Sequence, residues 1–166
     1  MCHPRPVRPS LYEHAGGAPA FLALARAHHA RCLADPELNH PFSHPDQHPQ
    51  HVERLAAYWA EALGGPPAYT RSMGGQHDVL HMHAGNGDMT DLGRRFVRCF
   101  ELAMDDAGLP ADAAFRDAMG AYMRWAVDDV LLYGEKDALI PEGDALPRWG
   151  WDGPEGQAAT DSRRRS

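Results

Sequence analysis

The sequence predicts an all-α domain, and three observations support this prediction. Apolar residues recur at intervals of three and four over several long stretches, as they do on one face of a helix. Clusters of proline and glycine separate these stretches. No stretch of useful length alternates apolar and polar residues in the manner of a half-buried strand. We therefore expect helices joined by turns, with no internal repeat.

The first long helix is expected to begin near Pro19, which suits a first helical turn, and to end before Pro36. His28 and His29 lie on adjoining faces of this helix, and periodicity does not decide which imidazole points into the protein. The face of His29 also carries Leu22 and Leu33. The other face carries Phe21, Leu24, Ala25, His28 and Cys32.

A proline-rich turn over residues 39–49 contains Phe42 and precedes a second helix, expected from about Pro49 to Leu63. Residues 64–67, Gly-Gly-Pro-Pro, end that helix. A short helix carrying His83 follows. Two long helices complete the domain, one from about Thr90 to the Gly-Leu-Pro of residues 108–110 and one containing Phe115. Their apolar stripes are Leu92, Phe96, Cys99, Phe100, Ala103 and Ala107, then Phe115, Met119, Tyr122, Ala126 and Val130.

Length and composition fit one domain of 166 residues with 43% apolar residues. The formal net charge of −7 argues against a broad surface for nucleic acid or an anionic membrane. We expect a disordered segment over residues 1–10, the domain over 11–152 and a disordered tail over 153–166. The N-terminal segment has no apolar core of a signal peptide or membrane span. Cys2, Cys32 and Cys99 form no metal-type pair, which favours a reducing, cytoplasmic location.

His83 carries the clearest functional signal in the chain. It follows Val79 and Leu80 by four and three positions, so these residues share one face of the short helix, which Gly85 then ends. An imidazole on an apolar face near a helix end can bind the iron of a haem, although a core histidine with a satisfied hydrogen bond gives the same pattern. His51 at a matching place on the earlier helix favours the first interpretation.

The order and spacing of several short motifs resemble those of the group II truncated haemoglobins, in particular the bacterial branch that ends in a Pro-Arg-Trp motif. The resemblance covers about residues 11–151. The motifs are Gly16-Gly17, Ala34-Asp35-Pro36, Phe42, His51-Val52 with Leu55, Gly64-Gly65-Pro66, Val79 to Gly87 with His83, Arg94-Arg95-Phe96-Val97, Ala107 to Pro110, and Pro147 to Trp151.

The resemblance implies a two-over-two helical sandwich around one haem b, with His83 as the proximal ligand of the iron. His81 and His77 are alternatives, but His81 points toward another side of the helix. Phe42 resembles the aromatic residue that stacks on the porphyrin edge, and its alternative is an ordinary core residue. Arg54 resembles the cation that pairs with a haem propionate, and its alternative is a solvated charge. The expected cofactor contacts are Phe42, Arg54, Leu55, Tyr69, Leu80 and Phe96.

Two positions depart from the family pattern on the distal side, where the ligand binds. His29 stands where the family commonly has a tyrosine, and Phe96 stands where it commonly has a tryptophan, whose indole N–H is thereby lost. We therefore expect His29 and His51 to supply the hydrogen bonds to a bound ligand. The alternatives for His51 are a solvent-facing position and direct coordination of the iron in the resting state.

The expected function is reversible binding of dioxygen, nitric oxide or carbon monoxide, and the same iron could support nitric oxide or peroxide chemistry. Such chemistry would need an external electron donor or reductase, because the chain has no flavin or nicotinamide fingerprint. One alternative is a zinc or nickel site in the histidine-rich turn, formed by His44, His48 and His51. Another alternative is a helical interaction module that binds no haem.

Overall fold

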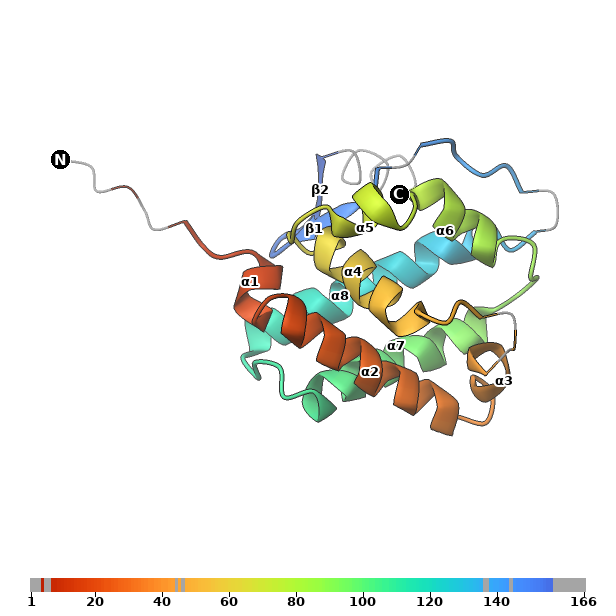
Figure 1. Ribbon diagram of the computed structural model, residues 1–166, viewed down its shortest axis with the longest axis horizontal. Helices are drawn as coiled ribbons and strands as arrows, with labels where there is room; N and C mark the ends of the chain where they lie inside the picture. The colour runs from red at the N-terminus through yellow and green to blue at the C-terminus, as the bar shows by residue number, and fades with distance from the viewer. Residues whose placement is uncertain are drawn as a thin grey trace.

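The computed structural model describes residues 4, 7–43, 45, 47–135, 138–143 and 145–156. The expected ends of the chain at residues 1–3, 5–6 and 157–166 lie outside the described residues, as do His44 and Cys2. The described part is predominantly helical, which confirms the predicted fold class (Figure 1). Its elements are α1 (Leu11–Ala15), α2 (Ala18–Ala34), α3 (Asn39–Phe42), α4 (His51–Ala62), α5 (Ala68–Ser72), α6 (Gln76–His83), α7 (Thr90–Asp106), α8 (Ala113–Leu131), β1 (Arg148–Gly150) and β2 (Gly153–Glu155).

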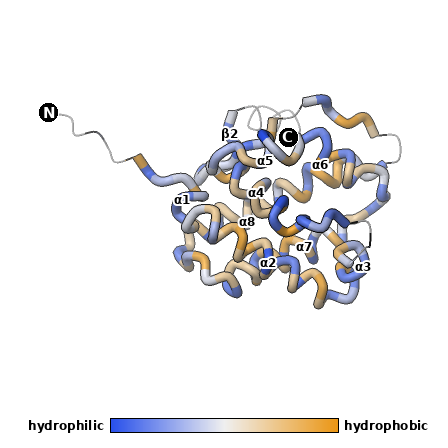
Figure 2. Tube along the Cα trace, viewed as in Figure 1, coloured by the Kyte–Doolittle hydropathy of each residue, from blue (hydrophilic) through white to orange (hydrophobic). Residues whose placement is uncertain are grey.

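Four long helices form the body of the protein. Helix α2 packs against both α4 and α7, and α7 packs against α8. Figure 1 shows α3 and α6 toward the end of the molecule opposite α1. Orange and blue residues mix along α2 and α7 in Figure 2, as expected for helices that each bury one side. The core between these helices contains Phe21, Leu24, Trp59, Phe100, Phe115, Met119 and Tyr122.

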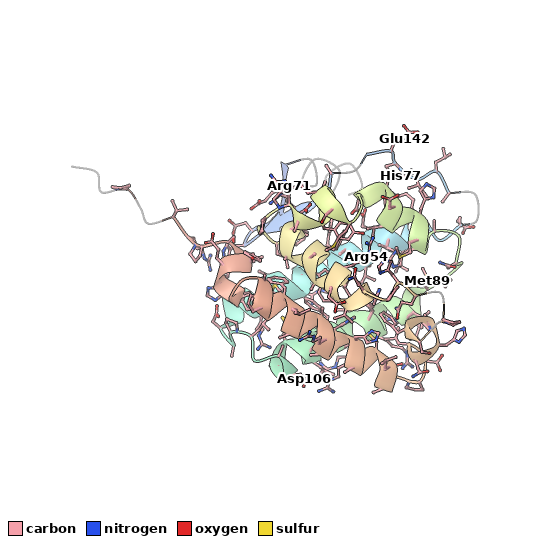
Figure 3. The ribbon with its side chains drawn as sticks, viewed as in Figure 1. Arg54, Arg71, His77, Met89, Asp106 and Glu142 are labelled. Atoms are coloured by element: carbon pink, nitrogen blue, oxygen red, sulfur yellow. The ribbon has the colours of Figure 1, made fainter. Side chains whose placement is uncertain are left out.

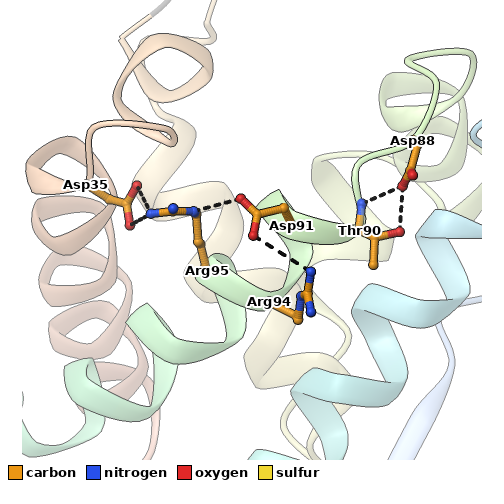
Figure 4. Close-up of polar contacts among 6 residues, drawn as sticks. All are labelled: Asp35, Asp88, Thr90, Asp91, Arg94 and Arg95. Atoms are coloured by element: carbon orange, nitrogen blue, oxygen red, sulfur yellow. Dashed lines mark hydrogen bonds and ion pairs between the residues drawn. The ribbon is translucent and has the colours of Figure 1, made fainter.

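A close approach of α7 to α8 depends on Gly93. A Cβ atom at this position would lie 2.8 Å from Cγ1 of Val127 on α8, which is closer than real contacts of this kind. Any side chain at Gly93 would therefore push the two helices apart. The start of α7 is fixed separately, because the carboxylate of Asp88 accepts hydrogen bonds from the backbone N–H and the hydroxyl of Thr90 (Figure 4).

The C-terminal end of α2 is joined to α7 by charged side chains, which Figure 4 shows in detail. Nη1 of Arg95 donates to the carboxylate of Asp35 at 3.2 Å, and Nε of Arg95 donates to Asp91 at 2.9 Å. Asp35 also accepts from the backbone N–H groups of Glu37 and Leu38. One carboxylate thus orders the turn after α2 and pairs with α7.

The hairpin of β1 and β2 is a feature that the sequence did not predict. Its strands pair antiparallel, with Trp149 opposite Pro154. The indole N–H of Trp151 donates to the carbonyl of Pro9 at 2.8 Å, and the guanidinium of Arg8 lies 3.5 Å from the centre of the Trp151 ring. These contacts join the N-terminal segment to the C-terminal hairpin.

Cys32 and Cys99 are free and buried, as the helical pattern predicted. They lie in a small apolar cluster with Leu38, between α2 and α7. Burial raises the pKa of the Cys32 thiol, which keeps the group neutral. Among the described residues, no helix is both long enough and apolar enough to cross a membrane.

Candidate functional site

His83 is the last residue of α6. Its Nδ1 lies 2.8 Å from the carbonyl oxygen of Val79, one turn earlier in the same helix. A carbonyl oxygen only accepts, so Nδ1 carries the proton and donates it, whereas Nε2 keeps its lone pair. This is the tautomer and the kind of backbone support that metal-binding histidines have in proteins.

The sequence suggested that His83 lies on the buried, apolar face of its helix. In the structure its side chain does not lie there. Leu80 is only 4% exposed, Val79 is half-buried and His83 is exposed. Leu80 and His83 stand about 60° apart around the helix, since each residue turns the chain by about 100°. Leu80 lies on the side that is covered by protein, and His83 lies at the edge of that side.

The loop after His83 is anchored to the end of α8. The backbone N–H of Gly85 donates to the carbonyl of Tyr133 at 3.0 Å, and that of Gly87 donates to the carbonyl of Gly134 at 2.9 Å. Gly134 needs to be small here, because a Cβ atom on it would lie 2.6 Å from the carbonyl oxygen of Gly87. These bonds fix where α6 ends, and so they fix the position of the His83 backbone.

Opposite α6, four side chains from different elements come together. The ring of Phe42 on α3 lies 5.9 Å from the rings of both His51 on α4 and Phe96 on α7, and 6.1 Å from the ring of His29 on α2. The rings of His29 and His51 are 5.8 Å apart. His29, His51 and Phe96, which were expected on the distal side, are therefore neighbours of Phe42, although the four residues are far apart in sequence.

Two ring nitrogens in this group have no partner among the described residues. They are Nδ1 of His29 and Nε2 of His51, and both atoms are buried. A buried polar atom without a hydrogen bond is unfavourable, so such atoms usually face a ligand or an ordered water. Burial lowers the pKa of His51, and nearby His29 and His83 lower it further, which favours the neutral ring.

The two other histidines of α6 do not contact the residues of this group. His77 and His81 contact each other, with ring centres 4.2 Å apart.

The structure also separates the roles of His28 and His29. His28 is fully buried among Phe42, Trp59, Phe96 and Phe100. Its Nε2 donates to the carbonyl of Phe96 at 3.2 Å, and the Cys32 thiol lies 3.7 Å from its Nδ1. Burial lowers the pKa of His28 to about 4. His28 is therefore a neutral core residue, and His29 is the imidazole that faces His51.

Sequence reasoning had assigned no role to His28. The available signal was its place on the same helical face as Phe21, Leu24 and Cys32. The bond from His83 to the Val79 carbonyl was also missed, because a backbone acceptor leaves no trace in residue identity.

Arg54 is held by protein contacts on one side. Nη2 of Arg54 donates to the carbonyl of Met73 at 2.6 Å, and its guanidinium carbon lies 5.8 Å from the centre of the Tyr69 ring. Figure 3 labels Arg54 on α4. Tyr69 is buried, and burial raises the pKa of its hydroxyl although Arg54 acts in the opposite direction. The guanidinium has five N–H donors, so donors remain for an anionic group. Leu55 is half-buried beside the main core.

The alternative of a zinc or nickel site in the histidine-rich turn gains no support from the described residues. Within them, no group of three or more His, Cys, Asp or Glu side chains could hold a metal ion. His51 lies beside His29 and Phe42, and Nδ1 of His48 accepts a hydrogen bond from the backbone of Gln50 at 3.0 Å. His44, the third expected ligand, lies outside the described residues.

Comparisons with known proteins agree with this arrangement of helices. The family model of the bacterial-like globins matches residues 10–128. A search of curated proteins found no match. The chain is similar to the solved structure of the haemoglobin of Chloroflexus aurantiacus, with 25% identity, a TM-score of 0.64 and coverage of 75% of this chain and 98% of that one.

Two further solved structures are similar. The thermostable haemoglobin of Thermobifida fusca is 26% identical, has a TM-score of 0.60 and covers 74% of this chain and 97% of its own. The group II 2-on-2 haemoglobin of Agrobacterium tumefaciens is 24% identical, has a TM-score of 0.62 and covers 76% of this chain and 96% of its own, which supports the fold alone. The chain therefore belongs to the bacterial-like globin family and has the two-over-two fold of the group II truncated haemoglobins.

Proposed function

We propose that this protein binds one haem b and, through it, binds dioxygen reversibly, with His83 as the protein's ligand to the iron. The observation that carries the proposal is the hydrogen bond between His83 and the backbone. Its Nδ1 is engaged by the Val79 carbonyl at 2.8 Å, so its Nε2 is available to coordinate. Family membership supports the choice of haem over another metal.

The residues on the opposite side fit a haem pocket. Phe42 and Phe96 offer aromatic faces for the porphyrin, and their ring centres are 5.9 Å apart. Leu55, Tyr69 and Leu80 are the further expected contacts, and they are buried or half-buried. Arg54 would pair with a propionate through the donors that Met73 does not use.

When bound, haem supplies an iron atom with one position open to a diatomic molecule. The protein's contribution on that side is hydrogen bonding by His29 and His51. Their unpartnered ring nitrogens are buried, so a ligand with partial negative charge would satisfy them. Phe96 offers no donor, because phenylalanine has none. The two histidines therefore carry the polar interaction with the ligand.

The same site would accept nitric oxide and carbon monoxide. Turnover of nitric oxide or peroxide would further require electrons from a reductase or a small-molecule donor. A cytoplasmic location is consistent with Cys32 and Cys99, which are buried close together as free thiols.

Titration of the apoprotein with haemin tests the proposal. We expect an intense Soret band that saturates at one haem per chain. After reduction, the spectrum should change on exposure to dioxygen and return when dioxygen is removed. A chain that shows no saturable Soret band would refute haem binding, and a colourless chain that retains zinc would support the zinc alternative.

A further inference from the structure

Helix α6 carries a pair of histidines, besides His83, that the proposed haem site does not use. His77 and His81 are one helical turn apart. Their ring centres are separated by 4.2 Å, and the planes of the two rings make an angle of 76°. His81 is exposed and His77 is half-buried. His81 and His83 stand about 200° apart around the helix, so this pair and His83 point to different sides.

A backbone hydrogen bond fixes the tautomer of His77. Its Nδ1 lies 3.0 Å from the carbonyl oxygen of Pro141, so Nδ1 donates and Nε2 keeps its lone pair. The backbone N–H of His77 also donates to the carbonyl of Gly143 at 3.1 Å. An imidazole that is oriented in this way has the outer support that metal-binding histidines commonly have.

The surroundings of the pair suit a cation. Glu142 lies between the two residues that contact His77 and is exposed, and Figure 3 labels both Glu142 and His77. The net charge of −7 also attracts cations over longer range.

The spacing itself permits shared coordination. Two histidines at positions i and i+4 of one helix can bind the same zinc ion, as they do in the His-Glu-x-x-His motif of metalloproteases. Asp78 takes the place of the glutamate here, but its carboxylate accepts from the backbone N–H of Gly75 at 3.0 Å. Asp78 is thus occupied in capping α6, and the resemblance does not extend to protease chemistry.

We propose that His77 and His81 together bind one divalent transition-metal ion of the zinc class through their ring nitrogens. Water would complete the coordination, because the described residues contain no group of three potential protein ligands. The site would therefore be exchangeable. The bound ion would span one turn of α6, the helix that ends at His83, and would hold that turn helical.

Isothermal titration of the haem-loaded protein with zinc chloride tests this proposal. Haem loading keeps His83 engaged, and magnesium chloride serves as the comparison ion because it prefers oxygen ligands. We expect zinc but not magnesium to bind. His77→Gln and His81→Gln should each remove one zinc per chain or weaken its binding by at least about ten-fold.

His48→Gln is the matched control, because His48 is exposed and belongs to the other histidine-rich segment. It should leave zinc binding unchanged. Circular dichroism would establish that each variant is folded. The proposal is wrong if the wild-type protein binds no zinc. It is also wrong if folded His77→Gln and His81→Gln bind zinc as the wild type does, or if only His48→Gln loses it.

Discussion

His28 on α2 donates a hydrogen bond from Nε2 to the carbonyl oxygen of Phe96 on α7, at 3.2 Å. The next residue on α2, His29, faces His51, and the Phe96 ring packs against Phe42. This bond thus joins two helices that both carry residues of the candidate site. His28 is a positioning residue, and its own imidazole stays in the core.

Acid should destabilise the protein through His28. Its pKa is about 4 in the folded protein and about 6.5 when exposed, because burial disfavours the charged ring. Between these pH values the unfolded chain binds the proton more readily than the folded protein does. The stability that the neutral, buried His28 contributes is therefore complete above about pH 6.5 and is lost as the pH falls toward 4. The difference corresponds to about 3 kcal/mol. Urea unfolding at several pH values should show this loss.

His28→Leu tests the assignment of that loss. The free energy of unfolding of this variant should depend less steeply on pH between about 6.5 and 4. That of His48→Leu, which changes an exposed histidine, should follow the wild type. An unchanged slope in His28→Leu would show that another group governs acid unfolding.

His29 and His51 should slow the release of dioxygen. One hydrogen bond to a partly charged ligand is worth about 1.5 to 3 kcal/mol, so His51→Leu should release dioxygen about ten- to hundred-fold faster. We expect a smaller increase for His29→Leu, because His51 shares one face of α4 with Leu55, one turn further along. Stopped-flow mixing of the oxygenated protein with excess carbon monoxide measures these rates.

The competing possibility is that His51 coordinates the iron in the resting state. Carbon monoxide would then bind faster to His51→Leu than to the wild type, because the internal ligand no longer competes. Release and association rates that stay at wild-type values in both variants would show that neither histidine faces the ligand.

Phe96→Trp should add an indole donor beside the ligand. Phe96 is half-buried, with its ring 4.4 Å from that of His28 and 5.9 Å from that of Phe42. If its outer edge lines the pocket, dioxygen release should slow by about ten-fold or more. Phe96→Leu is the control, because it changes size without adding a donor. A change in thermal stability alone would place Phe96 in the core, away from the ligand.

The carboxylate of Asp35 should matter more to stability than its partner Arg95. Asp35 accepts from two backbone N–H groups and from Arg95, whereas Arg95 is a half-exposed partner that also pairs with Asp91. Surface ion pairs contribute little to the free energy of unfolding, whereas the loss of a carboxylate that accepts from backbone N–H groups lowers it more. Asp35→Ala should lower the melting temperature more than Arg95→Ala or Asp91→Ala. Equal effects of Asp35→Ala and Arg95→Ala would contradict this order.

The sequence predicted the long helices because each extends over three or more turns of apolar periodicity. Helices α2, α4 and α7 begin and end close to the expected positions. Helices α1, α3 and α5 have five residues or fewer, which is too short for a period to appear. The three-residue strands of the hairpin likewise show no alternation, and Trp149 and Trp151 are fixed by contacts with distant segments.

The candidate site was partly predictable for a similar reason. Order and spacing identified Phe42, His51, His83 and Phe96, and the fold brings three of them together. The choice between His28 and His29 required the packing of α2 against both α4 and α7, because adjacent residues differ by only about 100° around a helix. The exposure of His83 could not be predicted either, since it depends on how α6 packs against the rest of the protein.

The spectrum of His83→Ala with haem tests the central claim most directly. If His83 is the iron ligand, the purified variant should lose stable haem binding or bind haem only through a distal imidazole. Added free imidazole should restore a ferrous carbonyl spectrum like that of the wild type, because it replaces the missing ring. His81→Ala should behave as the wild type. An unchanged ferrous carbonyl spectrum of His83→Ala without added imidazole would contradict the assignment.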